Sequence, residues 1–330
     1  MKPKSKNQKV PFFIIISIFI FFSVAMNPAF GQPKRGLGTK WDPIKIGTVF
    51  AYQFMPSHRA VDILTERGVF AAAYTFPSAV ERLEAVAAGY LNLSYAGLTA
   101  STLLAAAGKD IVVLCWTNEG GRAIVARKEI KTLQDLKGKK VGTVFGSIEH
   151  ISLIGELLSA GINPKDVDVV NIGGYDLLPL AMLQGGIVAY CGNEPISQIG
   201  VTKYDGHILS YAHNSPMGKI DSGLETTREF IDKYPEIVYA VVKAHVEAVE
   251  YYNKNPHAAV RDAVERYKIT AEVVESVRKN TPLMYDIKLG NMKALAEFLK
   301  DQGYIKTIPD WNKFVDDRFL IKAKQELGIQ

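Results

Sequence analysis

The side chains best suited to bind a small molecule lie where predicted strands end and predicted helices begin. In open α/β sheets, ligands bind outside the carboxyl ends of the strands, beside the free N–H groups of the helices that follow. That rule selects loops with hydroxyl, amide, aromatic, imidazole and carboxylate groups. The predicted ligand-binding residues are Tyr52, Gln53, Ser78, Tyr95, Thr99, Trp116, Ser147, Glu149, His150, Asn193 and Glu194.

Two of these loops carry distinct chemistry. Ser147 follows Gly146 at a strand-to-helix turn, where it can cap the helix while nearby N–H groups hold an anionic or polar ligand group. Glu194 precedes Pro195 at a strand end and can accept hydrogen bonds from an amine or amidine. Structural alternatives remain open: an N-cap for Ser147, a first-turn acid for Glu149, a salt bridge for Glu194, and core packing for the aromatic residues.

The sequence has no recognisable catalytic motif. It contains no GxSxG, GxxxxGK[ST], GxGxxG or HExxH, and its six histidines show no ligand spacing with cysteine or acid. We therefore expect a protein that is not an enzyme and that uses neither a metal nor a cofactor. Cys115 and Cys191 each end an apolar run, which favours two small buried side chains over the alternative of one disulfide.

Length and charge narrow the class of protein. A chain of 330 residues suggests about two domains, and 48% hydrophobic with 22% charged residues is ordinary globular composition. The net charge of +5 includes four lysines within the first nine residues, so the remaining chain is nearly neutral. This distribution argues against a nucleic-acid partner.

Those lysines precede an apolar run, residues 11–26, which is followed by the small residues Ala29 and Gly31. This order is typical of a secretory signal peptide, here residues 1–31, cleaved after Gly31. An uncleaved membrane anchor is the alternative, because the run approaches the length of a spanning helix. We expect the mature protein to be free in the periplasm.

Strand-like and helical patterns alternate along the mature chain, which predicts an α/β fold with buried, mainly parallel sheets. The predicted strands are residues 44–50, 70–74, 91–95, 111–115, 140–144, 167–172 and 187–191. Later helices are predicted at residues 226–253, 256–267, 271–280, 291–302 and 311–320. Residues 118–128 and 203–222 are predicted connections between two α/β units.

Three segments resemble a known family. These are IKTLQDLKGKKVGTVFGSIEH, AVERLEAVAAGYLNLSYAGLTAS and DLLPLAMLQGGIVAYCGNEP, and they resemble segments of the periplasmic solute-binding proteins of nitrate, sulfonate, taurine and thiamine-pyrimidine importers. The likeness covers about residues 44–256. It implies a type II periplasmic binding protein fold, with two lobes, each a mainly parallel sheet flanked by helices, and a ligand cleft between them.

The resemblance also implies a monomer that captures a small-molecule ligand and delivers it to an ABC permease in the inner membrane. With the predicted connections, it gives one lobe from residues 32–124 and 220–330, and a second from residues 125–219. A pyrimidine-forming enzyme on the same scaffold, or a ligand sensor for a membrane receptor, are the alternative functions.

Charge in the selected loops favours one kind of solute. They contain no lysine, Arg122 is the only arginine near them, and Glu119, Glu149, Asp176 and Glu194 are acidic. A bare anion beside unpaired buried carboxylates is costly. We therefore expect a small organic solute with an amine or amide-like edge, either aminopyrimidine-like or a taurine/sulfonate-like zwitterion.

Overall fold

The computed structural model describes residues 36–329, except residues 77, 216 and 220. The predicted signal peptide, residues 1–31, lies outside the described residues. Within the described part of the chain, no helix has both the length and the apolar character needed to cross a membrane.

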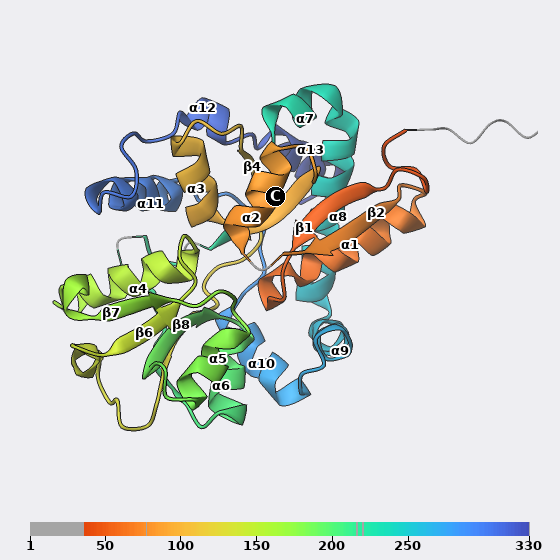
Figure 1. The fold of residues 1–330 in the computed structure, drawn as a ribbon. Helices are drawn as coiled ribbons and strands as arrows, with labels where there is room; N and C mark the ends of the chain where they lie inside the picture. Colours follow the sequence, from red (N-terminus) through yellow and green to blue (C-terminus); the bar gives the residue numbers. More distant parts are fainter. Residues whose placement is uncertain (1–35, 77, 216, 220, 330) are drawn as a thin grey trace, which may run out of the picture. The chain divides into compact units, whose positions relative to one another are not determined.

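Two five-stranded sheets organise the chain (Figure 1). The first sheet has the order β2-β1-β3-β10-β4, and the second has the order β7-β6-β8-β5-β9. In each sheet one strand, β10 or β5, pairs antiparallel with its neighbours, while β1–β2, β1–β3, β6–β7 and β6–β8 are parallel. Their bounds are β1 (Ile44–Thr48), β2 (Ala71–Thr75), β3 (Leu93–Gly97), β4 (Val112–Trp116), β5 (Arg122–Ala126), β6 (Lys140–Thr143), β7 (Asp168–Asn171), β8 (Ala189–Asn193), β9 (His207–Ser210) and β10 (Ser222–Thr226).

The α/β prediction is confirmed, but three strands were missed. β5, β9 and β10 lie in or at the edge of the segments predicted as connections. β5 begins with Arg122 and β10 contains Glu225, and both charged side chains are fully buried. Charged residues are seldom buried unless they are paired, so the sequence of these segments predicts surface loops and not buried strands. The predicted domain boundary between residues 124 and 125 falls inside β5.

Helices cover both sheets (Figure 1). The first sheet contacts α1 (Met55–Glu66), α2 (Ala79–Ala87), α3 (Leu98–Ala106), α12 (Trp311–Phe314) and α13 (Arg318–Leu327). The second sheet contacts α4 (Ile148–Ser159), α5 (Leu177–Leu183) and α6 (Ile196–Lys203). The remaining helices are α7 (Arg228–Lys233), α8 (Pro235–Lys254), α9 (Pro256–Tyr267), α10 (Ala271–Asn280) and α11 (Leu289–Asp301), with short 3-10 turns η1 (Tyr52–Phe54), η2 (Leu133–Leu136) and η3 (Pro164–Asp166).

Alternation along the strands gives each sheet two apolar faces. In β8, Ala189 and Cys191 join the core beneath α4, while Tyr190 between them joins the core on the opposite face. Successive strand side chains point to opposite faces, so a continuous apolar run fills both. Cys115 and Cys191 are buried free thiols, as the buried-hydrophobe interpretation predicts.

Two predicted helices are interrupted. The helix predicted at residues 226–253 is divided into α7 and α8 at Tyr234, because Pro235 occupies the first position of a new helix. The helix predicted at residues 311–320 is divided at Val315, whose extended backbone forms a bridge with Val113 of β4. Proline chemistry explains the first break, and tertiary pairing explains the second.

The segment between β4 and β5 runs from the first sheet to the second beside the residues that follow α10. Glu119 N donates to Pro282 O at 3.1 Å, and Gly121 N donates to Asn280 O at 3.0 Å. Gly121 has φ +79°, and a Cβ there would lie 2.8 Å from the Thr281 hydroxyl oxygen. The connection therefore depends on glycine both for its backbone conformation and for its close packing.

Candidate functional site

Loops and helix starts from both sheets enclose a small cavity of about 10 Å³, room for about one water molecule, called here the inner cavity. Gly97 at the end of β3 lies against Ile148 at the start of α4, so the two sides meet at its wall. Its lining residues are Val49, Gln53, Phe54, Ala79, Arg82, Gly97, Ile148, Glu149, Tyr175, Asn193 and Ser222.

Arg82, on α2, supplies a positive charge to the inner cavity. Its side chain is buried; Nε donates to Tyr95 O at 3.1 Å and Nη1 donates to Phe76 O at 3.2 Å. Burial lowers the pKa of Arg82 to about 10, while Tyr175, Glu225 and Glu149 act in the opposite direction. The guanidinium therefore stays charged at neutral pH.

Glu149, in the first turn of α4, supplies the negative charge. It is 2% exposed and accepts a hydrogen bond from the Tyr175 hydroxyl at 3.1 Å. Ser147 caps the same helix by accepting from His150 N at 3.2 Å. The N-terminal end of a helix stabilises a carboxylate, so α4 holds Glu149 at the wall facing Arg82.

Two carboxamide side chains reach the inner cavity from opposite sides. Gln53 lies in η1, after β1 of the first sheet, and Asn193 ends β8 of the second sheet. Each residue is 2% exposed, and neither Gln53 Oε1 nor Asn193 Oδ1 has a hydrogen-bond partner among the described residues. An unpartnered buried polar group costs about 1–3 kcal/mol. These two amides are therefore the groups most ready to bond a ligand.

The structure thus brings Gln53, Glu149 and Asn193 of the predicted set to one cavity, with Ser147 capping the same helix. The predicted aromatic residues Tyr95 and Trp116 do not line this cavity. Tyr95 lies in the core, where its hydroxyl is 3.2 Å from His245 Nδ1, and Trp116 is fully buried in a second core cluster. Alternation along β3 points Tyr95 to the face opposite Ala96, away from the inner cavity.

The other predicted residues also lie outside the inner cavity. Ser78 caps α2 by accepting from Glu81 N at 3.2 Å, and Thr99 is fully buried in α3. His150 stacks against the Phe145 ring at 4.6 Å, and burial lowers its pKa to about 4. Tyr52 lines a different cavity.

Glu194 is fully buried behind the inner cavity. Its Oε2 accepts from Gln198 N at 3.1 Å, Oε1 has no partner among the described residues, and burial raises its pKa to about 7. Its backbone joins the two sides, because Tyr52 N donates to Glu194 O at 3.1 Å and Glu194 N donates to Gly121 O at 2.9 Å. One oxygen and the backbone of Glu194 thus have structural partners, and its role in ligand binding stays a prediction.

Sequence reasoning missed Arg82 and Tyr175. The expectation that Arg122 is the only arginine near the site is wrong: Arg122 is buried in an ion pair with Asp221 at 2.7 Å, whereas Arg82 lines the inner cavity. A signal was present, because Arg82 occupies one position of the apolar stripe of α2, with Ala79, Leu83 and Val86. A charge in such a stripe must be buried or break the helix packing.

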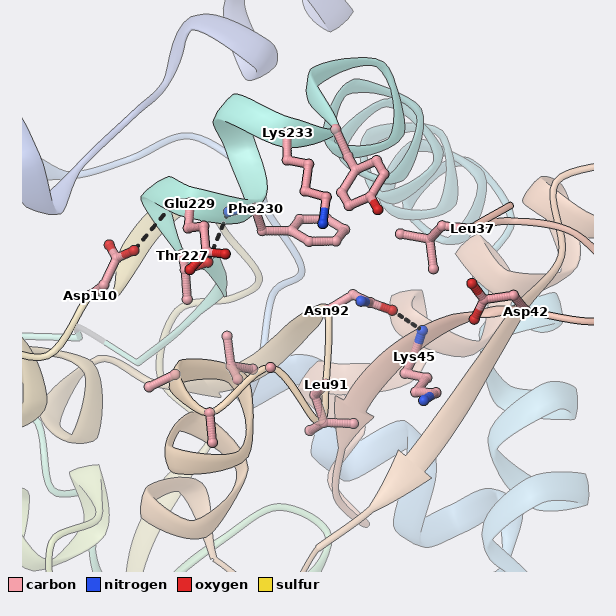
Figure 2. A pocket seen from close by; sticks show the side chains of 15 residues that line it. Leu37, Asp42, Lys45, Leu91, Asn92, Asp110, Thr227, Glu229, Phe230 and Lys233 are labelled. Atoms are coloured by element: carbon pink, nitrogen blue, oxygen red, sulfur yellow. Dashed lines mark hydrogen bonds between the residues drawn. The ribbon is translucent and has the colours of Figure 1, made fainter. Parts of the chain in front are cut away.

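A larger pocket of about 480 Å³, called here the edge pocket, lies where β1 and β3 begin (Figure 2). Two of its polar side chains, Asn92 and Asp110, stabilise backbone groups of the fold. Asn92 Oδ1 accepts from Lys45 N at 2.7 Å, and Asp110 accepts from the backbone N–H groups of Arg228 and Glu229 at the start of α7. Size alone therefore does not make it the candidate site.

The described residues include no cluster of three or more histidine, cysteine, aspartate or glutamate side chains arranged to hold a metal ion. The inner cavity instead offers two amides, a guanidinium and a carboxylate. Together these groups can bind a small polar molecule through hydrogen bonds and charge.

Known proteins are similar to this chain in sequence and in fold. The taurine-binding periplasmic protein of Escherichia coli K12 is 26% identical over 267 residues, which is 74% of this chain and 82% of that protein. The alkanesulfonate-binding protein SsuA of Xanthomonas axonopodis pv. citri superposes with a TM-score of 0.74 at 18% identity, covering 83% of this chain and 98% of that one.

The periplasmic nitrate-binding protein NrtA of Synechocystis superposes with a TM-score of 0.73 at 14% identity, covering 86% of this chain and 89% of that one. These similarities confirm the periplasmic binding protein fold. Residues 40–267, more than half of the chain, match the NMT1-like family. The chain therefore belongs to the NMT1-like family.

Proposed function

We propose that this protein is the solute-binding component of an ABC importer and that it binds a small zwitterionic solute in the inner cavity. The observation that carries this proposal is the pair of buried amides, Gln53 and Asn193, which line one cavity from two sides and whose oxygens have no hydrogen-bond partner in the described part of the chain. A solute that bonds to both amides would hold the two sides together. Such closure is the ordinary mechanism of hinged binding proteins.

The charges of the inner cavity favour a zwitterion. Arg82 suits a sulfonate or carboxylate group, and Glu149 suits an ammonium group. A solute with only a negative charge would be repelled by the Glu149 carboxylate. A solute with only a positive charge would be repelled by the Arg82 guanidinium. The similarity to a taurine-binding protein supports the same choice, because taurine carries both groups.

The domain arrangement is part of this proposal. One lobe comprises residues 32–124 and 220–330, and the other comprises residues 125–219, with the chain crossing between them near Gly121 and Asp221. The buried Arg122–Asp221 ion pair joins these two crossings at 2.7 Å. Lobe movement about this pair would open the inner cavity to solvent.

Localisation and partners complete the proposal. The apolar segment of residues 11–26 directs export as a signal peptide cleaved after Gly31, and the mature protein acts as a periplasmic monomer that meets an inner-membrane permease. The family relatives named periplasmic support this compartment. No covalent chemistry is assigned to the inner cavity.

Thermal unfolding tests the ligand class. Taurine, an alkanesulfonate, nitrate and an aminopyrimidine are each added to the purified protein at matched ionic strength. Ligand at about 100 times its Kd stabilises by about 2.7 kcal/mol, so taurine should raise Tm by a few degrees. A larger shift with nitrate or with the aminopyrimidine would overturn the zwitterion assignment.

A further inference from the structure

A second cavity, of about 140 Å³, lies beside the connection between the two sheets and is called here the hinge cavity. Its lining residues are Tyr52, Tyr252, Asn253, Arg278, Thr281, Pro282 and Leu283. The segment after α10 forms part of its wall, and this segment is hydrogen-bonded to the chain between β4 and β5. The hinge cavity is therefore attached to the backbone that any movement of the lobes would bend.

Tyr52 and Gln53 are adjacent in η1 but line different cavities. Tyr52 is 1% exposed, and its hydroxyl interacts electrostatically with Arg278 and Glu275 on α10. Burial raises the pKa of Tyr52, so the hydroxyl keeps its proton as a donor. This buried donor is available to a molecule in the hinge cavity.

Two more donors accompany it. The hydroxyl of Thr281 is buried without a partner among the described residues. Arg278 uses Nε and Nη2 on one oxygen of Glu275, at 3.3 and 2.9 Å, which leaves Nη1 outside those bonds. The hinge cavity is thus rich in donors.

We propose that the hinge cavity is a second binding site, one that takes a small oxyanion between Arg278 and the Tyr52 hydroxyl. Charge-assisted hydrogen bonds from guanidinium to oxyanions are among the strongest that proteins form. Glu275 offsets part of the arginine charge, so the site suits a single anionic group with modest affinity. The sulfonate, carboxylate or phosphate group of a small organic molecule has this chemistry, and Pro282 and Leu283 offer apolar walls to its carbon atoms.

Sulfate is the probe for this site. Titration calorimetry of the purified protein against sodium sulfate, with chloride to hold ionic strength constant, should give saturable binding with a Kd on the order of 1 mM. Arg278→Gln should weaken it about tenfold, and Tyr52→Phe about threefold, because each removes a donor. Arg228→Gln is the matched control, since Arg228 is 34% exposed and Arg278 is 35% exposed, and both are paired with acids.

The outcomes separate this site from the inner cavity. Sulfate binding that Arg278→Gln and Tyr52→Phe weaken, and that Gln53→Ala leaves intact, supports the hinge cavity. Binding lost in Gln53→Ala but kept in Arg278→Gln would place sulfate in the inner cavity and overturn the inference. Equal heats in the parent protein and all variants, or no saturation, would also overturn it. A failure of taurine to bind the inner cavity would leave this result unchanged.

Discussion

The inner cavity and the edge pocket both contain amide and carboxylate side chains, yet they differ in how those groups are satisfied. In the edge pocket, Asn92 accepts from Lys45 N and Asp110 caps α7, so the polar groups stabilise the first sheet and its helix (Figure 2). In the inner cavity, the amide oxygens of Gln53 and Asn193 have no partner among the described residues. The proposed site therefore rests on two unsatisfied amide oxygens that meet at one cavity, and not on volume.

The largest expected effect comes from Arg82, which interacts electrostatically with Glu225 and Glu149. Arg82→Met removes a buried charge and leaves acidic groups uncompensated, so we expect the free energy of unfolding to fall by about 3–5 kcal/mol in urea denaturation. Arg228→Met should cost less, about 1 kcal/mol, because Arg228 is 34% exposed and its partner Asp316 also pairs with Arg318. Similar losses from the two variants would show that the inner cavity does not depend on its buried arginine.

Three variants, two in the inner cavity and one in the edge pocket, test the comparison directly. Gln53→Ala and Asn193→Ala should each weaken taurine binding about tenfold, because each removes a hydrogen bond to the solute, and should change stability by less than about 1 kcal/mol. Asn92→Ala should do the opposite: it should lower stability by about 1 kcal/mol, because Lys45 N loses its acceptor, without changing taurine affinity. Calorimetry measures the taurine affinity of all three variants, and urea denaturation measures their stability. If Gln53→Ala or Asn193→Ala lowered stability without lowering affinity, the amides would be structural and not ligand-binding.

Glu194 should make stability depend on pH. Its pKa is about 7 in the folded protein because of burial, against an ordinary value of 4.5, so the folded state binds the proton more tightly. The resulting stability is present at low pH and is lost as pH rises from about 4.5 to about 7. Between pH 5 and pH 8 the loss should be about 2–3 kcal/mol.

The Glu194→Gln variant isolates this contribution. Other buried groups titrate in both proteins, including Asp221, whose pKa burial raises to about 6, so the difference between parent and variant reports Glu194 alone. Relative to the parent, the variant should gain stability steadily from pH 5 to pH 8. A constant difference across that range would mean that Glu194 is not titrating there.

The smallest effect is expected in the edge pocket. Lys233 is exposed, and its ammonium group lies 5.3 Å from the Tyr234 ring centroid. Lys233→Ala should change the free energy of unfolding by less than about 0.5 kcal/mol and leave taurine affinity unchanged. A clear loss of affinity would show that the edge pocket contributes to solute binding.

Much of the fold follows from sequence periodicity. The strands β1, β3, β4, β6 and β8 are apolar runs followed by turn residues, and helices such as α4 and α9 follow amphipathic patterns. The missed strands β5 and β10 contain Arg122 and Glu225, whose charges have partners distant in sequence. Asp221 pairs with Arg122, and Ser101 donates to Glu225 at 2.9 Å. Local pattern cannot indicate a strand whose burial depends on such partners.

The sequence by itself determined the α/β class, the family resemblance and the strand-end loops that supply Gln53, Glu149 and Asn193, because hydrophobic periodicity and turn chemistry are local properties. Only the tertiary structure decided which side chains face the inner cavity. Tyr95 points into the core because neighbouring strand residues alternate between faces, and Arg82 reaches the cavity from a helix position that normally holds an apolar residue. The direction of a side chain and the identity of its partners depend on residues distant in sequence, and together they decide the charge of the inner cavity.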